Sequence, residues 1–281
     1  MTYQQSLTKV IATLTFCGSA ILPVSAQLPT IEKKPWQGYY AAYANRHFQF
    51  TATSDGQITL TPLGDDGEPV AKRLAIPIDI TIQEAAADGK TTTKKIKLET
   101  LQSTSPVTDK LVKAAFTGKV TGDASFEVAI EQQRNAISIG GRMLDPGTLK
   151  KNQLRFSFQI KFPEPYLSTF KTGKKEEKEF EKTIGKDRID LKWADGKRGK
   201  FNLGDKVDAI TKEGNGSSIT SAEIDISAYE GQKFVFASSP NASMTFSTDQ
   251  ATPLHQGFTL VWTPDANKDP DGKARLSFEV K

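Results

Sequence analysis

Cysteine and histidine are almost absent from this chain, which has one cysteine, Cys17, and two histidines, His47 and His255, among its 281 residues. Cys17 lies in an N-terminal segment that we expect to be removed, so the remaining protein has no disulfide and its core must stabilise it unaided. The histidines lie far apart in the sequence, and neither has the His-x-x-x-His or cysteine-containing spacing of a zinc site. The available residue types therefore disfavour a zinc hydrolase.

Motifs for nucleotide and serine chemistry are also missing. The sequence contains no Gly-x-Ser-x-Gly elbow, no Walker loop and no dinucleotide fingerprint, and the pair Gly140 and Gly141 is followed by no helical pattern. The formal net charge is only +4, and lysines alternate with acids in residues 174–182. Such a run is typical of a solvated face, so we expect no nucleic-acid partner.

The first 26 residues have the layout of a secretory signal peptide. A positive charge precedes an apolar stretch from residue 10 to residue 22, and small residues end at Ala26, where we expect the cut. The apolar stretch spans roughly 20 Å as a helix, which is shorter than the ~30 Å membrane core. A lipoprotein acylated on Cys17 is the alternative, but Phe16 is too bulky for that cleavage. We predict an exported protein, periplasmic or extracellular, with no transmembrane segment after cleavage.

Alternating apolar and polar residues dominate the rest of the chain, and this pattern predicts strands that bury one face. The clearest single strand spans residues 154–162, and the most regular alternation spans 76–82. Four hairpins are predicted, at residues 48–60, 126–139, 189–203 and 234–246. Many short strands and little helix predict an all-β protein with an antiparallel β-sandwich architecture.

We predict two sandwich domains, residues 27–165 and 187–281. Removing 26 of 281 residues leaves 255, which approaches the size at which one core divides into two. Residues 166–186 have the weakest strand signal and predict a charged linker or short helix, because glutamate and lysine are good helix formers. A single long sandwich, with sheets built from the whole chain, is the alternative.

Aromatic residues concentrate just after the expected cleavage site, where Trp36, Tyr39, Tyr40 and Tyr43 precede Arg46. Aromatic faces stack on sugar rings, and arginine adds a directional donor, so this cluster predicts a glycan-binding platform. The same spacing is that of one helical stripe, and the alternative is a segment that plugs an open end of the sandwich.

Trp193 is a further candidate for ligand binding, because it lies beside a charged hairpin tip. It also alternates with Leu191, and this pattern favours the alternative of a core tryptophan.

A loop near the C-terminus carries oxygen side chains at alternate positions, namely Asp265, Asn267, Asp269 and Asp271, and Gly272 follows. Several such oxygens can converge on a hard cation, so the loop predicts a structural calcium site. Its first part resembles the first half of an EF-hand-type calcium loop, but the later acid is displaced by one position and no helix flanks the loop. A soluble hairpin tip rich in turn-forming residues is the alternative.

Two functional hypotheses follow. The first is an exported, noncatalytic β-sandwich protein that binds a glycan or another cell-envelope component, such as an envelope protein. The second is a carbohydrate-active enzyme, a glycoside hydrolase or polysaccharide lyase, whose acid pair is assembled from distant strands. A cleft that brings His47 or His255 together with acids, tyrosine or arginine would favour the enzyme, and a flat aromatic strip would favour the binder.

Overall fold

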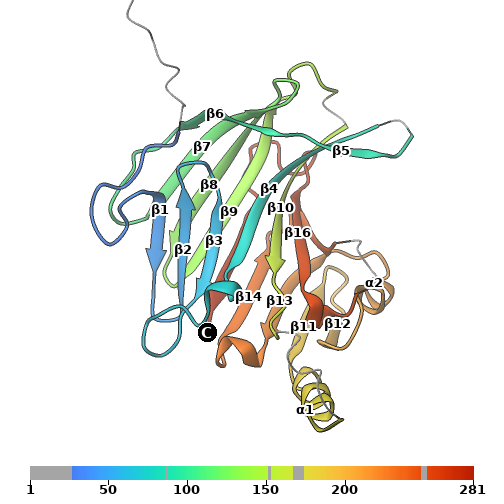
Figure 1. Cartoon of the computed structure of the whole chain (residues 1–281). Coiled ribbons are helices and arrows are strands. Elements are labelled where there is room, and N and C mark those ends of the chain that lie inside the picture. The colour runs from blue at the N-terminus through green and yellow to red at the C-terminus, as the bar shows by residue number, and fades with distance from the viewer. Residues whose placement is uncertain (1–26, 87, 151–152, 167–173, 248–251) are drawn as a thin grey trace, which may run out of the picture.

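The computed structural model describes residues 27–86, 88–150, 153–166, 174–247 and 252–281. In these residues two antiparallel sheets, of eight and nine strands, face each other and enclose the core (Figure 1). The prediction of an all-β sandwich is confirmed. The expected signal peptide, residues 1–26, lies outside the described residues.

The first sheet, sheet A, has the strand order β1-β2-β3-β4-β10-β16-β15, and β5 pairs with β4. Its strands are β1 (Tyr39–Ala44), β2 (Phe48–Thr53), β3 (Ile58–Pro62), β4 (Ile76–Ala85), β5 (Thr91–Thr93), β10 (Leu154–Phe162), β15 (Ala242–Phe246) and β16 (Phe258–Pro264).

The second sheet, sheet C, has the order β12-β11-β13-β14-β17-β9-β8-β7-β6. Its strands are β6 (Ile96–Ser103), β7 (Lys113–Val120), β8 (Ser125–Gln133), β9 (Ala136–Asp145), β11 (Arg188–Trp193), β12 (Arg198–Asn202), β13 (Ile219–Asp225), β14 (Lys233–Ser238) and β17 (Leu276–Val280).

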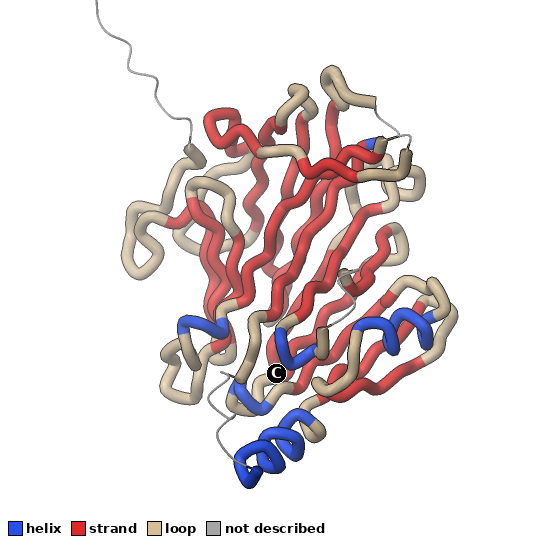
Figure 2. Tube along the Cα trace, turned by 45° about the vertical axis from the view of Figure 1, so that its right-hand side comes forward, coloured by secondary structure: helices blue, strands red, loops and turns tan. Residues whose placement is uncertain are grey.

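Helices are few, and most of them lie toward the lower end of the sandwich in Figure 2. The α-helices are α1 (Lys174–Ile184) and α2 (Val207–Gly214), and the 3-10 helices are η1 (Lys72–Leu74), η4 (Ser227–Tyr229) and η5 (Leu254–Gln256). The short helix expected in residues 166–186 is thus present as α1. None of the described helices has the length and apolar character needed to cross a membrane.

The structure corrects the expected division into two sandwiches, because strands from both halves of the chain share each sheet. In sheet A, β10 pairs with β16, where Phe158 lies opposite Trp262. In sheet C, β9 pairs with β17, where Ile139 lies opposite Leu276. One hydrophobic cluster contains buried residues from both halves. The observed arrangement is therefore the alternative, a single long sandwich.

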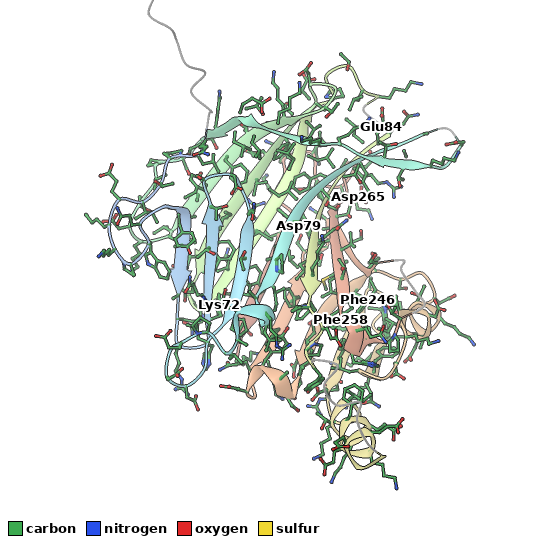
Figure 3. The ribbon with its side chains drawn as sticks, viewed as in Figure 1. Lys72, Asp79, Glu84, Phe246, Phe258 and Asp265 are labelled. Carbon is green, nitrogen blue, oxygen red and sulfur yellow. The ribbon has the colours of Figure 1, made fainter. Side chains whose placement is uncertain are left out.

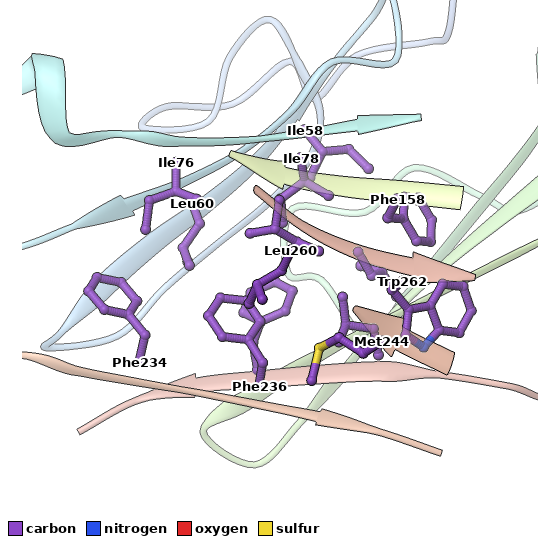
Figure 4. Close-up of a cluster of buried hydrophobic side chains, with 14 of the residues drawn as sticks. Ile58, Leu60, Ile76, Ile78, Phe158, Phe234, Phe236, Met244, Leu260 and Trp262 are labelled. Atoms are coloured by element: carbon purple, nitrogen blue, oxygen red, sulfur yellow. The ribbon is translucent and has the colours of Figure 1, made fainter. Parts of the chain in front are cut away.

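The core lies between the sheets, where the alternating apolar residues point inward. Figure 4 shows Leu60, Ile76 and Leu260 of sheet A facing Phe234 and Phe236 of sheet C. The ring of Trp262 stacks on Phe158 at 5.6 Å between ring centroids, and its indole Nε1 donates a hydrogen bond to Ser238 Oγ at 3.1 Å. This contact satisfies the polar atom of a fully buried side chain.

Three of the four expected hairpins form, as the pairs β2–β3, β8–β9 and β11–β12. The expected hairpin at residues 234–246 does not form. Its first strand, β14, pairs with β13 and β17 in sheet C, whereas its second strand, β15, pairs with β16 in sheet A. The chain changes sheets between these two strands, so each is paired with strands distant in sequence.

Candidate functional site

The aromatic cluster after residue 36 lies in a turn and in β1, so its spacing does not reflect a helix. Tyr40 is buried, and its hydroxyl donates a hydrogen bond to the Ala115 carbonyl at 2.6 Å. Its ring packs edge-on against Phe116. Burial leaves Tyr40 no face to offer a sugar, and this one residue behaves as the plug alternative requires.

The other members of the cluster lie on β1 and in the segments directly before and after it. Trp36 and Tyr39 are half-buried and form an edge-to-face pair at 6.5 Å between ring centroids. Tyr43 packs against the core beside Phe48. Arg46 is exposed in the turn that follows the strand. The six residues of β1 separate Trp36 from Arg46, so the structure does not bring the whole cluster to one place, and glycan binding by its exposed members stays a prediction.

Trp193 is 2% exposed and packs edge-on against Phe201. A Cβ atom built on Gly199 would approach its ring to 2.4 Å, and one on Gly214 would approach it to 2.5 Å. The two glycines therefore allow α2 and β12 to close over the indole. Trp193 is a core residue, which corrects its assignment to a ligand-binding surface.

The loop from Asp265 to Gly272 is held by its own backbone. Asp269 is 5% exposed, and its carboxylate accepts hydrogen bonds from the Lys273 amide at 2.7 Å and the Ala274 amide at 2.9 Å. Asp265 Oδ1 accepts the Asn267 amide at 3.0 Å, and this bond lowers the pKa of Asp265.

Asp271 in the same loop is exposed and forms an ion pair with Lys273, which lowers the pKa of Asp271. Within the described residues no group of three His, Cys, Asp or Glu side chains is arranged to hold a metal. Calcium binding by Asp265, Asn267, Asp269 and Asp271 stays a prediction, and the hydrogen bonds account for the fold of the loop without an ion.

A groove of about 450 Å³ lies on the outer face of sheet A. Its floor is formed by side chains of β4 and β10 that alternate with the inward-pointing isoleucines and phenylalanines, because successive residues of a strand face opposite sides. Asp79 in the middle of β4 marks this floor (Figure 3). The lining residues are Asp55, Gly56, Gln57, Ile78, Asp79, Ile80, Thr81, Thr93, Ile96, Leu98, Gln159 and Lys161.

The floor is ordered by strand register. Asp79 of β4 lies opposite Gln159 of β10, and Thr81 lies opposite Ser157 one row further along. The turn between β2 and β3 also lines the groove and contributes Asp55 and Gln57. Gly56 in this turn has a φ of +80°, which a residue with a Cβ atom rarely adopts.

The chain from β5 to β6 forms the roof of the groove, and in Figure 1 it crosses β4 near the top of the view. It contributes Thr93, Ile96 and Leu98, the last of which is 46% exposed. The ion pair between Lys94 and Glu84, at 2.6 Å, ties the start of this connection to β4. The groove is thus lined by aliphatic side chains of β6, by Thr93 of β5 and by the polar floor.

The charges in the groove are paired with neighbouring side chains. Lys161 Nζ lies 2.5 Å from Asp79 Oδ2. Asp55 accepts hydrogen bonds from the Thr53 hydroxyl and from Gln57 Nε2, the latter at 2.8 Å. The groove therefore presents two carboxylates, one ammonium group and two amides, which are groups suited to hydrogen-bonding a polyhydroxyl ligand.

The two histidines lie outside the groove lining. His47 Nδ1 is 3.0 Å from Gln232 Oε1, and the Gln232 amide donates to the Leu63 carbonyl. The ring of His255 packs edge-on against Phe180, and its Nδ1 lies 3.3 Å from the Leu203 carbonyl oxygen. Neither histidine shares the groove with its carboxylates.

A buried polar cluster surrounds Asp187, which is 1% exposed. Asp187 accepts hydrogen bonds from the Ser227 amide at 2.9 Å, from the Ser227 hydroxyl and from the Tyr166 hydroxyl. Burial, followed by the bond to Asp187, raises the pKa of Tyr166. Burial also raises the pKa of Tyr229, whose hydroxyl has no hydrogen-bond partner among the described residues. These contacts fasten the chain between β10 and β11 to η4.

Sequence reasoning missed the residues that form the groove. Gln57, Asp79 and Gln159 come from three separate segments and belong to no motif. Alternation in β4 does place Asp79 on the face opposite Ile78 and Ile80, and this was the one available signal.

Known proteins resemble this chain in fold and not in sequence. No family model matches the sequence, and no curated protein matches it. The α-N-acetylgalactosaminidase NagBb of Bifidobacterium bifidum, solved with GalNAc, matches 86% of this chain and 36% of its own, with a TM-score of 0.52 and 10% identity. A quadruple mutant of NagBb matches the same shares, with a TM-score of 0.52 and 11% identity.

The protein Slr1438 of Synechocystis sp. PCC 6803 matches 86% of this chain and 95% of its own, at a TM-score of 0.43 and 12% identity. At these identities the likeness to NagBb is one of fold. This chain spans about a third of the length of NagBb. It has the fold of a β-sandwich that forms one part of that larger protein.

Proposed function

We propose that this protein binds carbohydrate in the groove on the outer face of sheet A. The observation that carries the proposal is the lining of the groove, which combines the polar side chains of Gln57, Gln159 and Asp79 with the aliphatic side chains of Ile96 and Leu98. Amide and carboxylate groups hydrogen-bond sugar hydroxyls, and aliphatic side chains contact the C–H faces of the rings. The shared fold with part of a protein that acts on N-acetylgalactosaminides supports the same class of ligand.

The groove favours binding over catalysis. The described residues of its lining include no histidine and no tyrosine, and both carboxylates are already engaged, Asp79 by Lys161 and Asp55 by Thr53 and Gln57. The part of NagBb that is similar to this chain covers only 36% of that enzyme. The similarity therefore does not assign the catalytic residues of NagBb to the sandwich.

Hydrolysis of a glycosidic bond is the second candidate, because Asp55 and Asp79 line the same groove and because NagBb, whose fold this chain shares in part, is a glycosidase. The comparison favours this candidate over a protein that only binds sugar. Paired carboxylates on either side of a glycosidic bond are the usual equipment of a glycosidase. In that case these two residues supply the acid and the base or nucleophile.

The proposal is tested by calorimetric titration of residues 27–281 with a panel of oligosaccharides. Gln57→Ala and Gln159→Ala each remove a hydrogen bond worth about 0.5–1.5 kcal/mol, so the Kd of a groove ligand rises roughly two- to tenfold. Gln49→Ala is the matched control, because Gln49 lies on β2 outside the groove lining. Equal effects of all three variants, or no binding by the unmodified protein, would contradict the proposal.

Product analysis separates binding from hydrolysis. Incubation of the unmodified protein with each bound oligosaccharide, followed by chromatography, yields only intact sugar if the protein is a binder. Shorter products that disappear with Asp55→Asn or Asp79→Asn would establish the glycosidase instead.

The proposal also places the protein outside the cytoplasm, on the pattern in residues 1–26. N-terminal sequencing of protein exported by a bacterial host tests this, and a start at Gln27 is the expected result. A start at Met1 in the mature protein would contradict export by cleavage.

A further inference from the structure

The row of side chains that forms the floor of the groove continues beyond it. In the antiparallel register Asp79 lies opposite Gln159, Gln159 lies opposite Val261, and Val261 lies opposite Thr245. Adjacent strands are about 4.8 Å apart, so the three steps from β4 to β15 add roughly 14 Å. Val261 is half-buried and Thr245 is exposed, so the row stays at the surface after the roof ends.

The surface on β16 and β15 is polar without being charged. The outward-facing residues that flank the row on these strands are Thr259, Thr263 and Ser243. On β4 and β10, Asp79 and Lys161 carry the charges within the groove, and they neutralise each other as an ion pair. Asp55, at the turn between β2 and β3, leaves one negative charge in the groove, whereas a ligand that continues along the row on β16 and β15 meets hydroxyl and methyl groups and no charge.

We infer that the groove and this surface form one track, along Asp79, Gln159, Val261 and Thr245, for a long neutral polysaccharide. The inference rests on the proposed function and adds the length and the charge of the ligand. The chain runs across the strands, with its first sugars under the roof and the following sugars on β16 and β15. An acidic polymer gains nothing on this track, since Lys161 is already paired with Asp79 and the Asp55 carboxylate adds a negative charge.

Comparison of short and long ligands of one composition tests the track. The neutral probes are three soluble polymers, β-glucan, xylan and galactomannan, and a trisaccharide of each. Polygalacturonate is the acidic polymer. We expect the matching polymer to bind about tenfold more tightly than its trisaccharide, because the additional sugars contact β16 and β15. Binding of the neutral polymer should change little with salt concentration.

Two variants locate the additional contacts. Val261→Lys and Thr245→Glu place charged side chains on the track outside the groove, and each should bring the polymer and trisaccharide Kd values close together without changing the trisaccharide Kd. Ala237→Lys is the matched control, because Ala237 faces outward on β14 in the opposite sheet. Thermal unfolding confirms that each variant is folded.

The outcomes separate this inference from the proposed function. If the trisaccharide binds and depends on Gln159, but Val261→Lys and Thr245→Glu leave the polymer-to-trisaccharide ratio unchanged, the track is overturned and the groove stands. Tighter binding of polygalacturonate than of every neutral polymer also overturns the track. If no sugar of either length binds, the proposed function fails and the track fails with it.

Discussion

Replacement of Asp269 by alanine should destabilise the protein through its backbone and not through a metal. Asp269 is 5% exposed, and its carboxylate accepts hydrogen bonds from two backbone amides, those of Lys273 and Ala274. Each buried donor left without an acceptor costs about 1–3 kcal/mol, and the Lys273 amide can regain water because its residue is exposed. We therefore expect the free energy of unfolding to fall by about 1–3 kcal/mol, which corresponds to a Tm lower by roughly 2–12 °C.

Urea unfolding with calcium and with a chelator provides the assay. If the hydrogen bonds stabilise the loop, the unmodified protein unfolds at the same urea concentration in both conditions, and Asp269→Ala lowers the midpoint equally in both. Asp271→Ala is the matched control, because its ion pair with Lys273 is exposed and screened by solvent, so its loss should leave the urea midpoint nearly unchanged. A calcium-dependent midpoint in the unmodified protein that Asp269→Ala abolishes would refute this reasoning and establish the predicted metal site.

Three further predictions concern the core. Residues 27–165 and 187–281, expressed separately, should each fail to give a cooperative unfolding transition, because β10–β16 and β9–β17 pairing joins them; two cooperative fragments would contradict this. Above about pH 10 the Tyr229→Phe variant should lose less stability than the unmodified protein. Burial raises the pKa of Tyr229 above that of an unfolded tyrosine, so the stability linked to its neutral form is lost as pH rises through the raised pKa. Urea midpoints that fall in parallel with pH for the two proteins would contradict this prediction. Gly141→Ala should cost about 1–3 kcal/mol, because its Cβ would lie 2.1 Å from Phe156 Cζ; an unchanged Tm would disprove the clash.

Much of the secondary structure follows from the sequence, because a strand that buries one face must alternate. Phe156, Phe158 and Ile160 identify β10, and the acidic and basic residues of 174–182 identify α1. Hairpin partners were predictable where a short turn connects two strands, as at Gly196. The pair β14 and β15 failed this rule, since the chain passes from one sheet to the other between them.

The site was much less predictable than the strands. Sequence spacing suggested a common face for Tyr39, Tyr40 and Tyr43, but a register shift between Tyr39 and Ala41 and the burial of Tyr40 separate them. Trp193 lies near a charged turn in the sequence, yet packing under α2 buries it.

The sequence by itself determined the class of fold and the positions of most strands, because alternation is a local property that each strand carries. Only the tertiary structure decided that both halves of the chain share one core and that Gln57, Asp79 and Gln159 line one groove. Which strands become neighbours depends on the fit of whole sheets across the core, and so does the identity of the side chains that meet on the outer face. No short stretch of sequence contains that information.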